Sequence, residues 1–227
     1  MRFEDRRRAG ERLAAKLRDQ AGETPLVLAL PRGGVPVAVP IAEALGASLD
    51  LLLVRKIGVP GHPEYAAGAV ADGAAPQIVR NEEVIAAVGL GDATFARLAG
   101  EQLREIESRR RRYLGDRASQ PVQGRTVIVV DDGIATGATM QAGLRALRSA
   151  GARRVVVATP VAPADAVSRL KSLADAVVVL DMPEPFHSVG EHYVDFRQVA
   201  DDEVVALLGG TASRHRHTRS GPNAGQG

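Results

Sequence analysis

The chain has 227 residues, no cysteine, 45% hydrophobic residues and a formal net charge of +2. This length and apolar content suffice for one large packed domain, and the lack of cysteine excludes disulfides, thiolate metal sites and a cysteine nucleophile. No apolar run approaches the roughly 18 residues of a membrane-spanning helix, and residues 1–6 lack the apolar core of a secretory signal. We therefore expect a soluble, cytoplasmic protein with no membrane partner.

The charge pattern gives little support to nucleic-acid binding. The 29 Lys and Arg residues nearly balance 27 Asp and Glu residues, and the excess is confined to clusters at residues 6–8, 109–112 and 214–219. Aromatic residues make up only 3% of the chain, which disfavours a module that stacks single-stranded bases on aromatic rings.

The first part of the chain predicts strands and helices in alternation. The expected elements are a covering helix over residues 3–18, strands over 26–30 and 49–54, and a helix over 35–45. Pro40 is awkward inside an uninterrupted helix, because it lacks the backbone N–H. Residues 57–64 contain two glycines and two prolines and predict a loop of lid length, followed by short strands at 66–71 and 77–80 that form a hairpin or flap.

The second part alternates more regularly and defines the fold class. Asp92 is a plausible N-cap for a long helix, and the expected elements after it are strands at 126–130, 155–159 and 176–180 and helices at 138–149, 164–173 and 201–208. This succession predicts an α/β protein with a Rossmann-like, mostly parallel sheet flanked by helices. We expect one domain over residues 1–210 and a disordered tail over 211–227, where apolar periodicity is absent.

The most informative segment follows the strand at 126–130. Asp131 and Asp132 come at the carboxyl end of that strand, where open α/β sheets place their ligands. The next residues form a small-residue turn into a helix, and together they offer backbone amides and hydroxyls to a phosphate: Gly133, Ile134, Ala135, Thr136, Gly137, Ala138 and Thr139. Two carboxylates beside a phosphate seat suit the hydroxyls of a ribose, so the segment predicts a site for a sugar 5-phosphate. A strand that ends in an acidic turn and a helix cap is the purely structural alternative.

Residues 127–139 resemble the phosphoribosyl-pyrophosphate (PRPP) signature of the type I phosphoribosyltransferases: four apolar residues, two acids and a Thr-Gly-x-Thr turn. The resemblance implies the fold of that family, with a small hood and a mobile lid loop. It also implies transfer of the 5-phosphoribosyl group from PRPP to a nitrogenous, nucleobase-like acceptor, with release of pyrophosphate. Magnesium carried by PRPP and a homo-oligomer, as a dimer, are implied as well.

Three further features carry the resemblance from about residue 24 to residue 208. Pro31-Arg32-Gly33 is similar to the family's pyrophosphate loop, which commonly holds a cis peptide, here between Pro31 and Arg32. Arg55 and Lys56 resemble a basic pair that neutralises pyrophosphate. The expected lid follows them and carries His62 and Glu64, whose roles the sequence leaves open.

The resemblance assigns Arg55, Lys56, Asp131 and Asp132 to catalysis, through charge stabilisation of the leaving group and of the ribose. Members of the family that act on 6-oxopurines place an acid three residues after the second Asp, whereas this chain has Ala135 there. The acceptor is therefore unidentified. The candidate hood over it spans residues 181–196, in which Phe186 or Tyr193 could stack on a ring, although ordinary packing explains them equally well.

The sequence also leaves other functions open. The main alternative is a non-catalytic regulatory protein that senses PRPP or a nucleotide, and an RNA-binding regulator would use residues 6–8 and 109–112. A hydrolase acting on a phosphorylated sugar comes last, because the chain lacks a Gly-x-Ser-x-Gly elbow and a clear nucleophile–base pair.

Overall fold

A parallel sheet forms the centre of the computed structural model, which describes residues 2–73 and 75–219. Within these residues, parallel strands pair in the order β2-β1-β6-β7-β8. Their bounds are β1 Leu26–Ala29, β2 Ser48–Leu51, β6 Thr126–Val130, β7 Arg154–Val161 and β8 Ala176–Asp181. Every residue of β1 and β6 is buried, because helices cover both faces of the sheet. The continuous apolar runs in the sequence therefore predicted β1 and β6 correctly, whereas the strand expected over 49–54 ends at Leu51.

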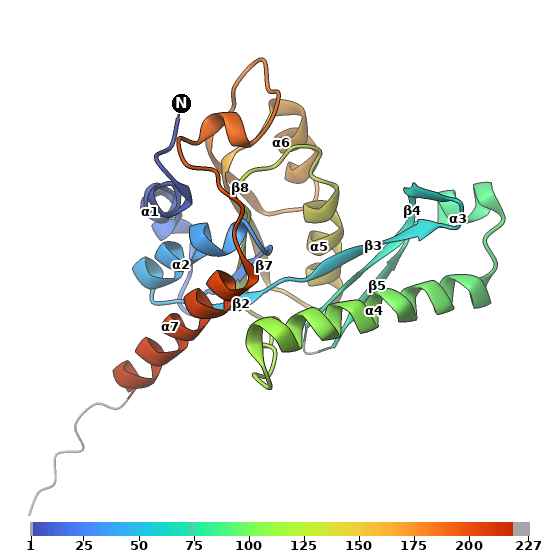
Figure 1. The fold of residues 1–227 in the computed structure, drawn as a ribbon, viewed down its shortest axis with the longest axis horizontal. Coiled ribbons are helices and arrows are strands. Elements are labelled where there is room, and N and C mark those ends of the chain that lie inside the picture. Colours follow the sequence, from blue (N-terminus) through green and yellow to red (C-terminus); the bar gives the residue numbers. More distant parts are fainter. Residues whose placement is uncertain (1, 74, 220–227) are drawn as a thin grey trace, which may run out of the picture.

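The helices form a layer on each face of the sheet (Figure 1). One layer holds α1 (Arg6–Leu17), α2 (Gly34–Leu45) and the beginning of α7 (Asp201–Arg219), and the other holds α5 (Ala138–Ser149) and α6 (Ala164–Lys171). The short 3₁₀ turns are η1 (Arg18–Gln20) and η2 (Gly190–His192). The α5 helix buries Met140, Gly143, Leu144 and Leu147, the spacing of one helical face. No helix in the described part of the chain is long and apolar enough to cross a membrane.

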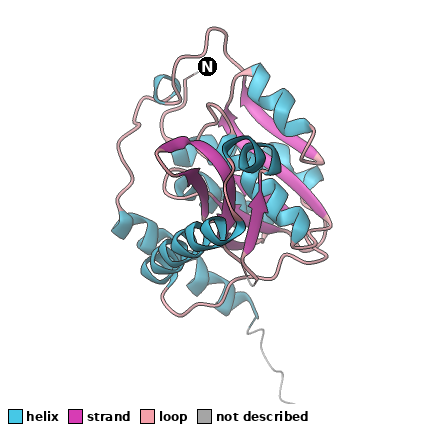
Figure 2. Ribbon diagram, turned by 90° about the vertical axis from the view of Figure 1, so that its right-hand side faces the viewer, coloured by secondary structure: helices cyan, strands magenta, loops and turns pink. Residues whose placement is uncertain are grey.

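Residues 54–114 form an arm that extends from the body of the molecule, and Figure 2 views it from its tip. Its antiparallel sheet consists of β3 (Val54–Val59), β4 (His62–Ala71) and β5 (Gln77–Arg80), with α3 (Glu82–Val88) at the tip and α4 (Asp92–Leu114) along its length. Buried Ile57, Phe95 and Ile106 belong to the same core cluster as the body. The predicted hairpin at 66–71 and 77–80 is thus present, inside a longer sheet.

The strand order places a topological switch point at β1. From this strand the chain continues to β2 on one side, and β6 pairs with it on the other, with Ala29 opposite Val130. A crevice at the carboxyl ends of two such strands is the usual ligand site of an open α/β sheet. The loops that follow β1 and β6 contain the two motifs that the sequence analysis singled out.

Three local expectations differ from the structure. The predicted lid loop over 57–65 is largely a hairpin, since β3 and β4 meet at a turn in which Gly61 has φ +80° and register shifts lie beside Gly58. Gly91 rather than Asp92 caps α4, and Asp92 lies in its first turn. Pro40 lies inside α2, where it packs against Gly10 of α1.

The last helix also ends later than expected. Helix α7 runs to Arg219 instead of ending at Leu208, so residues 211–219 are helical and only residues 220–227 of the expected tail lie outside the described residues. No proline interrupts residues 201–219, and buried Val204 and Leu208 anchor the first part of the helix in the core.

Candidate functional site

The loop between β6 and α5 has the geometry of a phosphate seat. Gly137 adopts φ +74° as the N-cap of α5, and no side chain caps this helix. The Thr136 hydroxyl lies 3.5 Å from the backbone nitrogen of Ala138. The amides of the first turn therefore face outward with the positive end of the helix dipole, which favours an anion.

Neighbouring strands fix this loop in place. The backbone N–H of Ile134 donates to the carbonyl of Val161 over 2.9 Å, and buried Ile134 anchors the loop in the core. Gly133 packs against Val189 of the hood so closely that an added Cβ would lie 2.2 Å from a methyl carbon of that valine. The seat is therefore part of the rigid framework.

The Pro31–Arg32 loop lies directly beside the acid pair. Leu30 donates its N–H to the carbonyl of Val130 over 2.9 Å, and a Cβ on Gly34 would lie 2.6 Å from that same oxygen. The peptide bond between Pro31 and Arg32 is cis, as the family resemblance led us to expect. The two motifs, about 100 residues apart in the sequence, thus meet at the switch point.

The two acids of the motif have different surroundings. Burial, followed by the negative charge of Asp132, raises the pKa of Asp131 well above its ordinary value. One oxygen of Asp131 accepts the backbone N–H of Asp132 over 2.9 Å. The protein therefore leaves part of the hydrogen-bonding capacity of this carboxylate available to a hydroxyl group of a ligand.

Asp132 is held by Arg6, which the sequence analysis did not assign to the site, and by Tyr193, which it named only as a candidate for the acceptor hood. Its Oδ2 accepts a hydrogen bond from Nε of Arg6 over 2.7 Å, and its main-chain carbonyl accepts one from the Tyr193 hydroxyl over 2.6 Å. Arg6 was noted only as part of a basic cluster, because nothing in the sequence pairs it with a residue 126 positions away. An arginine that starts a covering helix carries no local signal of such a role.

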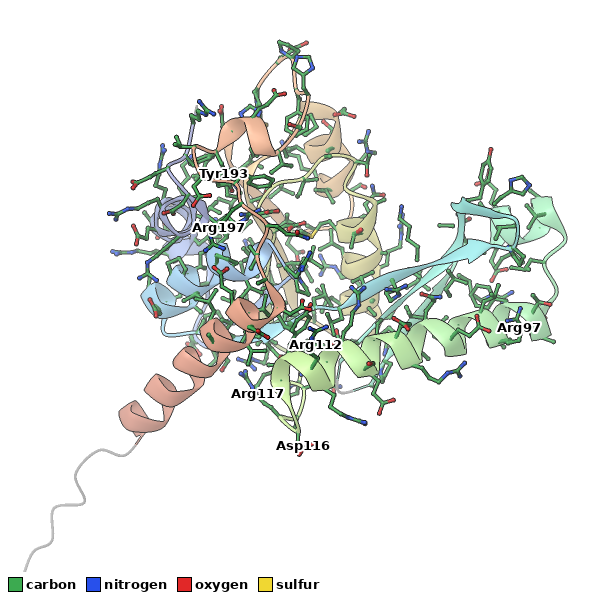
Figure 3. The ribbon with its side chains drawn as sticks, in the orientation of Figure 1. Arg97, Arg112, Asp116, Arg117, Tyr193 and Arg197 are labelled. Carbon is green, nitrogen blue, oxygen red and sulfur yellow. The ribbon has the colours of Figure 1, made fainter. Side chains whose placement is uncertain are left out.

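Arg32 lies at a junction between the site and two helices. Its Nη1 is 3.8 Å from Oδ1 of Asp201, an oxygen that also accepts the Tyr113 hydroxyl over 2.7 Å. Arg112 reaches the other oxygen of Asp201 over 2.9 Å, near the start of α7 (Figure 3). A cavity of about 260 Å³ lies between Arg32, Arg112 and the start of α7. An anion that arrives here would compete with Asp201 for Arg32.

The side chains of the expected basic pair, Arg55 and Lys56, point to opposite faces of β3. Arg55 donates to Oε1 of Gln102 on α4 over 2.7 Å. Lys56 lines a cleft of about 610 Å³ between the arm and α5, together with Ala138 and Gln141. Successive side chains of a strand point to opposite faces, so only Lys56 faces the helix that begins at the phosphate seat.

The aromatic residues of the hood mostly form its framework. Tyr193 is 1% exposed, and its ring lies between those of Phe3 and Phe196, at centroid distances of 5.5 and 5.1 Å. Figure 3 shows Tyr193 on the segment that leads down from the hood toward α7. Phe186 stacks on His192 at 5.7 Å. In this conformation Tyr193 therefore offers no free face to an acceptor, which agrees with the alternative that it serves ordinary packing.

The expected lid residues lie on the arm, in the hairpin. The ring of His62 meets that of Tyr65 edge-on at 6.0 Å, and the side chain of Glu64 lies outside the described part of the structure.

The chain resembles known proteins in family, sequence and fold. The model of the phosphoribosyl transferase domain family matches residues 3–195. A Mycobacterium tuberculosis protein named "Putative phosphoribosyl transferase Rv0571c" is 45% identical over 206 residues, which cover 91% of this chain and 46% of that protein. A ribose-phosphate pyrophosphokinase of Methanopyrus kandleri is 30% identical over 188 residues, which cover 69% of this chain and 61% of that enzyme.

A solved structure extends the similarity to three dimensions. The crystal structure of TT1426 from Thermus thermophilus superposes with a TM-score of 0.82 at 46% identity, and the match covers 92% of this chain and 98% of that one. The chain spans about half the length of the mycobacterial relative. Because the family model spans most of the chain and includes both motif loops, the chain belongs to the phosphoribosyl transferase domain family.

Proposed function

We propose that this protein transfers the 5-phosphoribosyl group from PRPP to a nitrogenous, nucleobase-like acceptor and releases pyrophosphate. The observation that carries the proposal is the contact of the two motif loops, in which Gly33 packs on the carboxylate of Asp132 beside the uncapped start of α5. A ribose with phosphoryl groups at both ends needs these elements side by side.

Each part of PRPP has a counterpart in the site. The 5-phosphate is assigned to the amides and hydroxyls of residues 133–139, and the ribose hydroxyls to the carboxylates of Asp131 and Asp132. Arg32 is assigned to the pyrophosphate, and Lys56 reaches the same region from the arm if the arm moves toward the seat. Positive side chains placed before the reaction stabilise the charge that builds on the leaving group.

The chemistry of the available donors fits magnesium that arrives with the substrate. In the described residues, no group of three or more His, Asp or Glu side chains is arranged to hold a metal ion. Mg²⁺ prefers phosphate oxygens and water as ligands, so the diphosphate of PRPP would carry the ion, and no side chain of this chain is assigned to it directly. When bound, the ion would neutralise charge on the pyrophosphate.

The acceptor end of the site lacks the acid of the 6-oxopurine pattern. Ala135 is exposed at the position of that acid, so this loop supplies no proton transfer to the acceptor. General acid–base catalysis contributes typically ~10²–10⁴-fold, a fraction of enzymatic rate enhancements of ~10⁶-fold or more. Charge stabilisation by Arg32 and the acid pair can therefore supply most of the acceleration.

Isothermal titration with PRPP and Mg²⁺ tests the binding site directly. We expect the native protein to bind and the double variant Asp131→Asn/Asp132→Asn to lose at least tenfold in affinity, since two charge-assisted hydrogen bonds disappear. Asp116→Asn is the matched control, because Asp116 is exposed on the far side of the molecule (Figure 3). Equal affinity of the native protein and the double variant would contradict the proposal.

A pyrophosphate-release screen with purine, pyrimidine, nicotinate and anthranilate acceptors then tests turnover. Release with one acceptor supports the transferase. Tight PRPP binding without release from any acceptor would favour the non-catalytic sensor. Formation of PRPP from ribose 5-phosphate and ATP would instead match the name of the Methanopyrus relative.

A further inference from the structure

Arg6 is a buried charged residue whose side chain reaches the acid pair from the first turn of α1. Its side chain is 10% exposed, and its Nε donates to Oδ2 of Asp132 over 2.7 Å. Burial of a guanidinium is costly unless an anion and further hydrogen bonds compensate it. The partners of the Arg6 guanidinium must therefore compensate the cost of its burial.

Those partners fix the guanidinium in one orientation. Nη1 donates to the carbonyl of Arg197 over 2.9 Å, and the guanidinium carbon lies 4.0 Å from the centroid of the Phe196 ring. The backbone N–H of Phe3 donates to His192, and that of Val194 donates to Phe3, both over 2.8 Å. The segment before α1 and the segment after η2 thus hold Arg6 from both sides.

The same contacts determine how Asp132 can meet a ligand. Arg6 occupies Oδ2, the Tyr193 hydroxyl holds the main-chain carbonyl, and Gly33 packs against the carboxylate. The Asp131 carboxyl lies within hydrogen-bond reach of the Asp132 carboxylate, and among the described residues no other side chain is bonded to its Oδ1. This leaves one oxygen of a fixed carboxylate for a hydroxyl group.

We propose that Arg6 is a positioning residue of the phosphoribosyl site. It fixes the orientation of the Asp132 carboxylate for a ribose hydroxyl and partly compensates the negative charge of the acid pair. The inference rests on the proposed function and adds to it a residue near the N-terminus, 126 positions from Asp132. Arg6 touches no part of the substrate in this scheme and acts through Asp132.

A double-mutant cycle between Arg6 and Asp132 tests this coupling in the full-length protein. Arg6→Met should weaken PRPP·Mg²⁺ binding about tenfold or more, while Arg6→Lys, which restores the charge without the fork, should recover part of the loss. In the Asp132→Asn background, Arg6→Met should change the affinity less than threefold, because its partner is already gone. Arg7→Met is the matched control, since Arg7 lies on the same turn with 57% of its side chain exposed.

Rescue by lysine is the readout that a purely structural role would not give. Because Arg6→Lys keeps the positive charge beside Asp132, it should bind PRPP·Mg²⁺ more tightly than Arg6→Met even where both variants are equally stable. Thermal unfolding of each variant measures any loss of fold separately.

The outcomes distinguish the inference from the function. If the native protein binds PRPP and Arg6→Met is as damaging in the Asp132→Asn background as in the native one, the coupling is absent and the inference fails while the function stands. Unchanged PRPP affinity in Arg6→Met also overturns it. If the native protein does not bind PRPP, the proposed function fails, and the inference fails with it.

Discussion

Gly33 touches the carboxylate of Asp132 so closely that a methyl group on its Cα would lie 2.0 Å from Oδ2. The contact joins the loop after β1 to the loop after β6 at the switch point of the sheet. Residue 33 must therefore lack a side chain. Its φ of −61° is allowed for any residue, so glycine is required by the lack of space beside Asp132 and not by an unusual backbone conformation.

Gly33→Ala should consequently disturb the site more than the fold. We expect a loss of about 1–3 kcal/mol in the free energy of unfolding from overpacking, and PRPP affinity reduced about tenfold or more, because the carboxylate or the loop must shift. Chemical denaturation and titration calorimetry measure the two effects.

The control is Gly100→Ala on α4, where the added Cβ meets only the far end of Arg104 at 3.6 Å. Alanine favours a helix interior over glycine by about 1 kcal/mol, so this variant should be equally or more stable and bind PRPP normally. If Gly33→Ala behaves in the same way, the contact with Asp132 has no influence on the site.

Gly133 and Val189 form a second contact of this kind, between the phosphate seat and the hood. An added Cβ on Gly133 would lie 2.2 Å from the valine, so Gly133→Ala should destabilise the protein by about 1–3 kcal/mol and weaken PRPP binding. Val189→Ala makes room for the methyl group, so the double variant should recover most of both losses. No recovery in denaturation and calorimetry would show that the strain arises elsewhere.

The sequence was sufficient to predict the parts of the fold that depend on neighbouring residues. Residues 26–30 and 126–130 read as buried strands because they are continuously apolar, and α5 has the predicted bounds of 138 and 149 because a glycine-rich turn precedes it and Gly151 follows it.

The rest depended on tertiary contacts. The contacts of Arg6, Tyr193 and Gly33 with Asp132 cross 61 or more positions of the sequence and are set by packing of the hood and α1. The glycines and prolines of 57–65 read as a loop, whereas the structure uses Gly58 and Gly61 for a register shift and a turn within a hairpin. Glycine indicates an unusual backbone without saying which kind.

Arg55 and Lys56 look equivalent in the sequence, but their side chains point to opposite faces of β3. Substitution of each should therefore have a different effect. Lys56→Met should lower kcat/KM for pyrophosphate release about tenfold or more, because Lys56 faces the helix of the phosphate seat. Arg55→Met should cost less in kcat/KM and more in stability, because Arg55 is bonded to Gln102 on α4. Steady-state kinetics and thermal unfolding of both variants check this; the reverse order would mean that the arm rearranges so that Arg55 reaches the substrate.

A buried ion triad joins the arm to the body beside a cavity of about 160 Å³. Arg110 of α4 donates to Asp72 over 2.7 Å and to both oxygens of Asp50 over 3.0 Å. The carboxylates are 4% and 2% exposed, so Arg110 compensates two charges that water hardly reaches. Burial raises the pKa of Asp72 from 3.8 to about 6 despite this partner.

A raised carboxyl pKa means that the native state binds the proton more tightly than the unfolded chain, so the free energy of unfolding falls as pH rises from about 4 to about 6.

Arg110→Met should cost about 3–5 kcal/mol in the free energy of unfolding, since it leaves buried charges without a cation. Because Arg110 lowers the pKa of Asp72, its removal raises that pKa further, and the cost should be larger at pH 8 than at pH 5. Denaturation of Arg110→Met at both pH values measures the difference, with Arg111→Met as control, because the side chain of Arg111 is 70% exposed and pairs with nearby Glu107 on the same helix. Equal losses at the two pH values would mean that Asp72 does not titrate in this range.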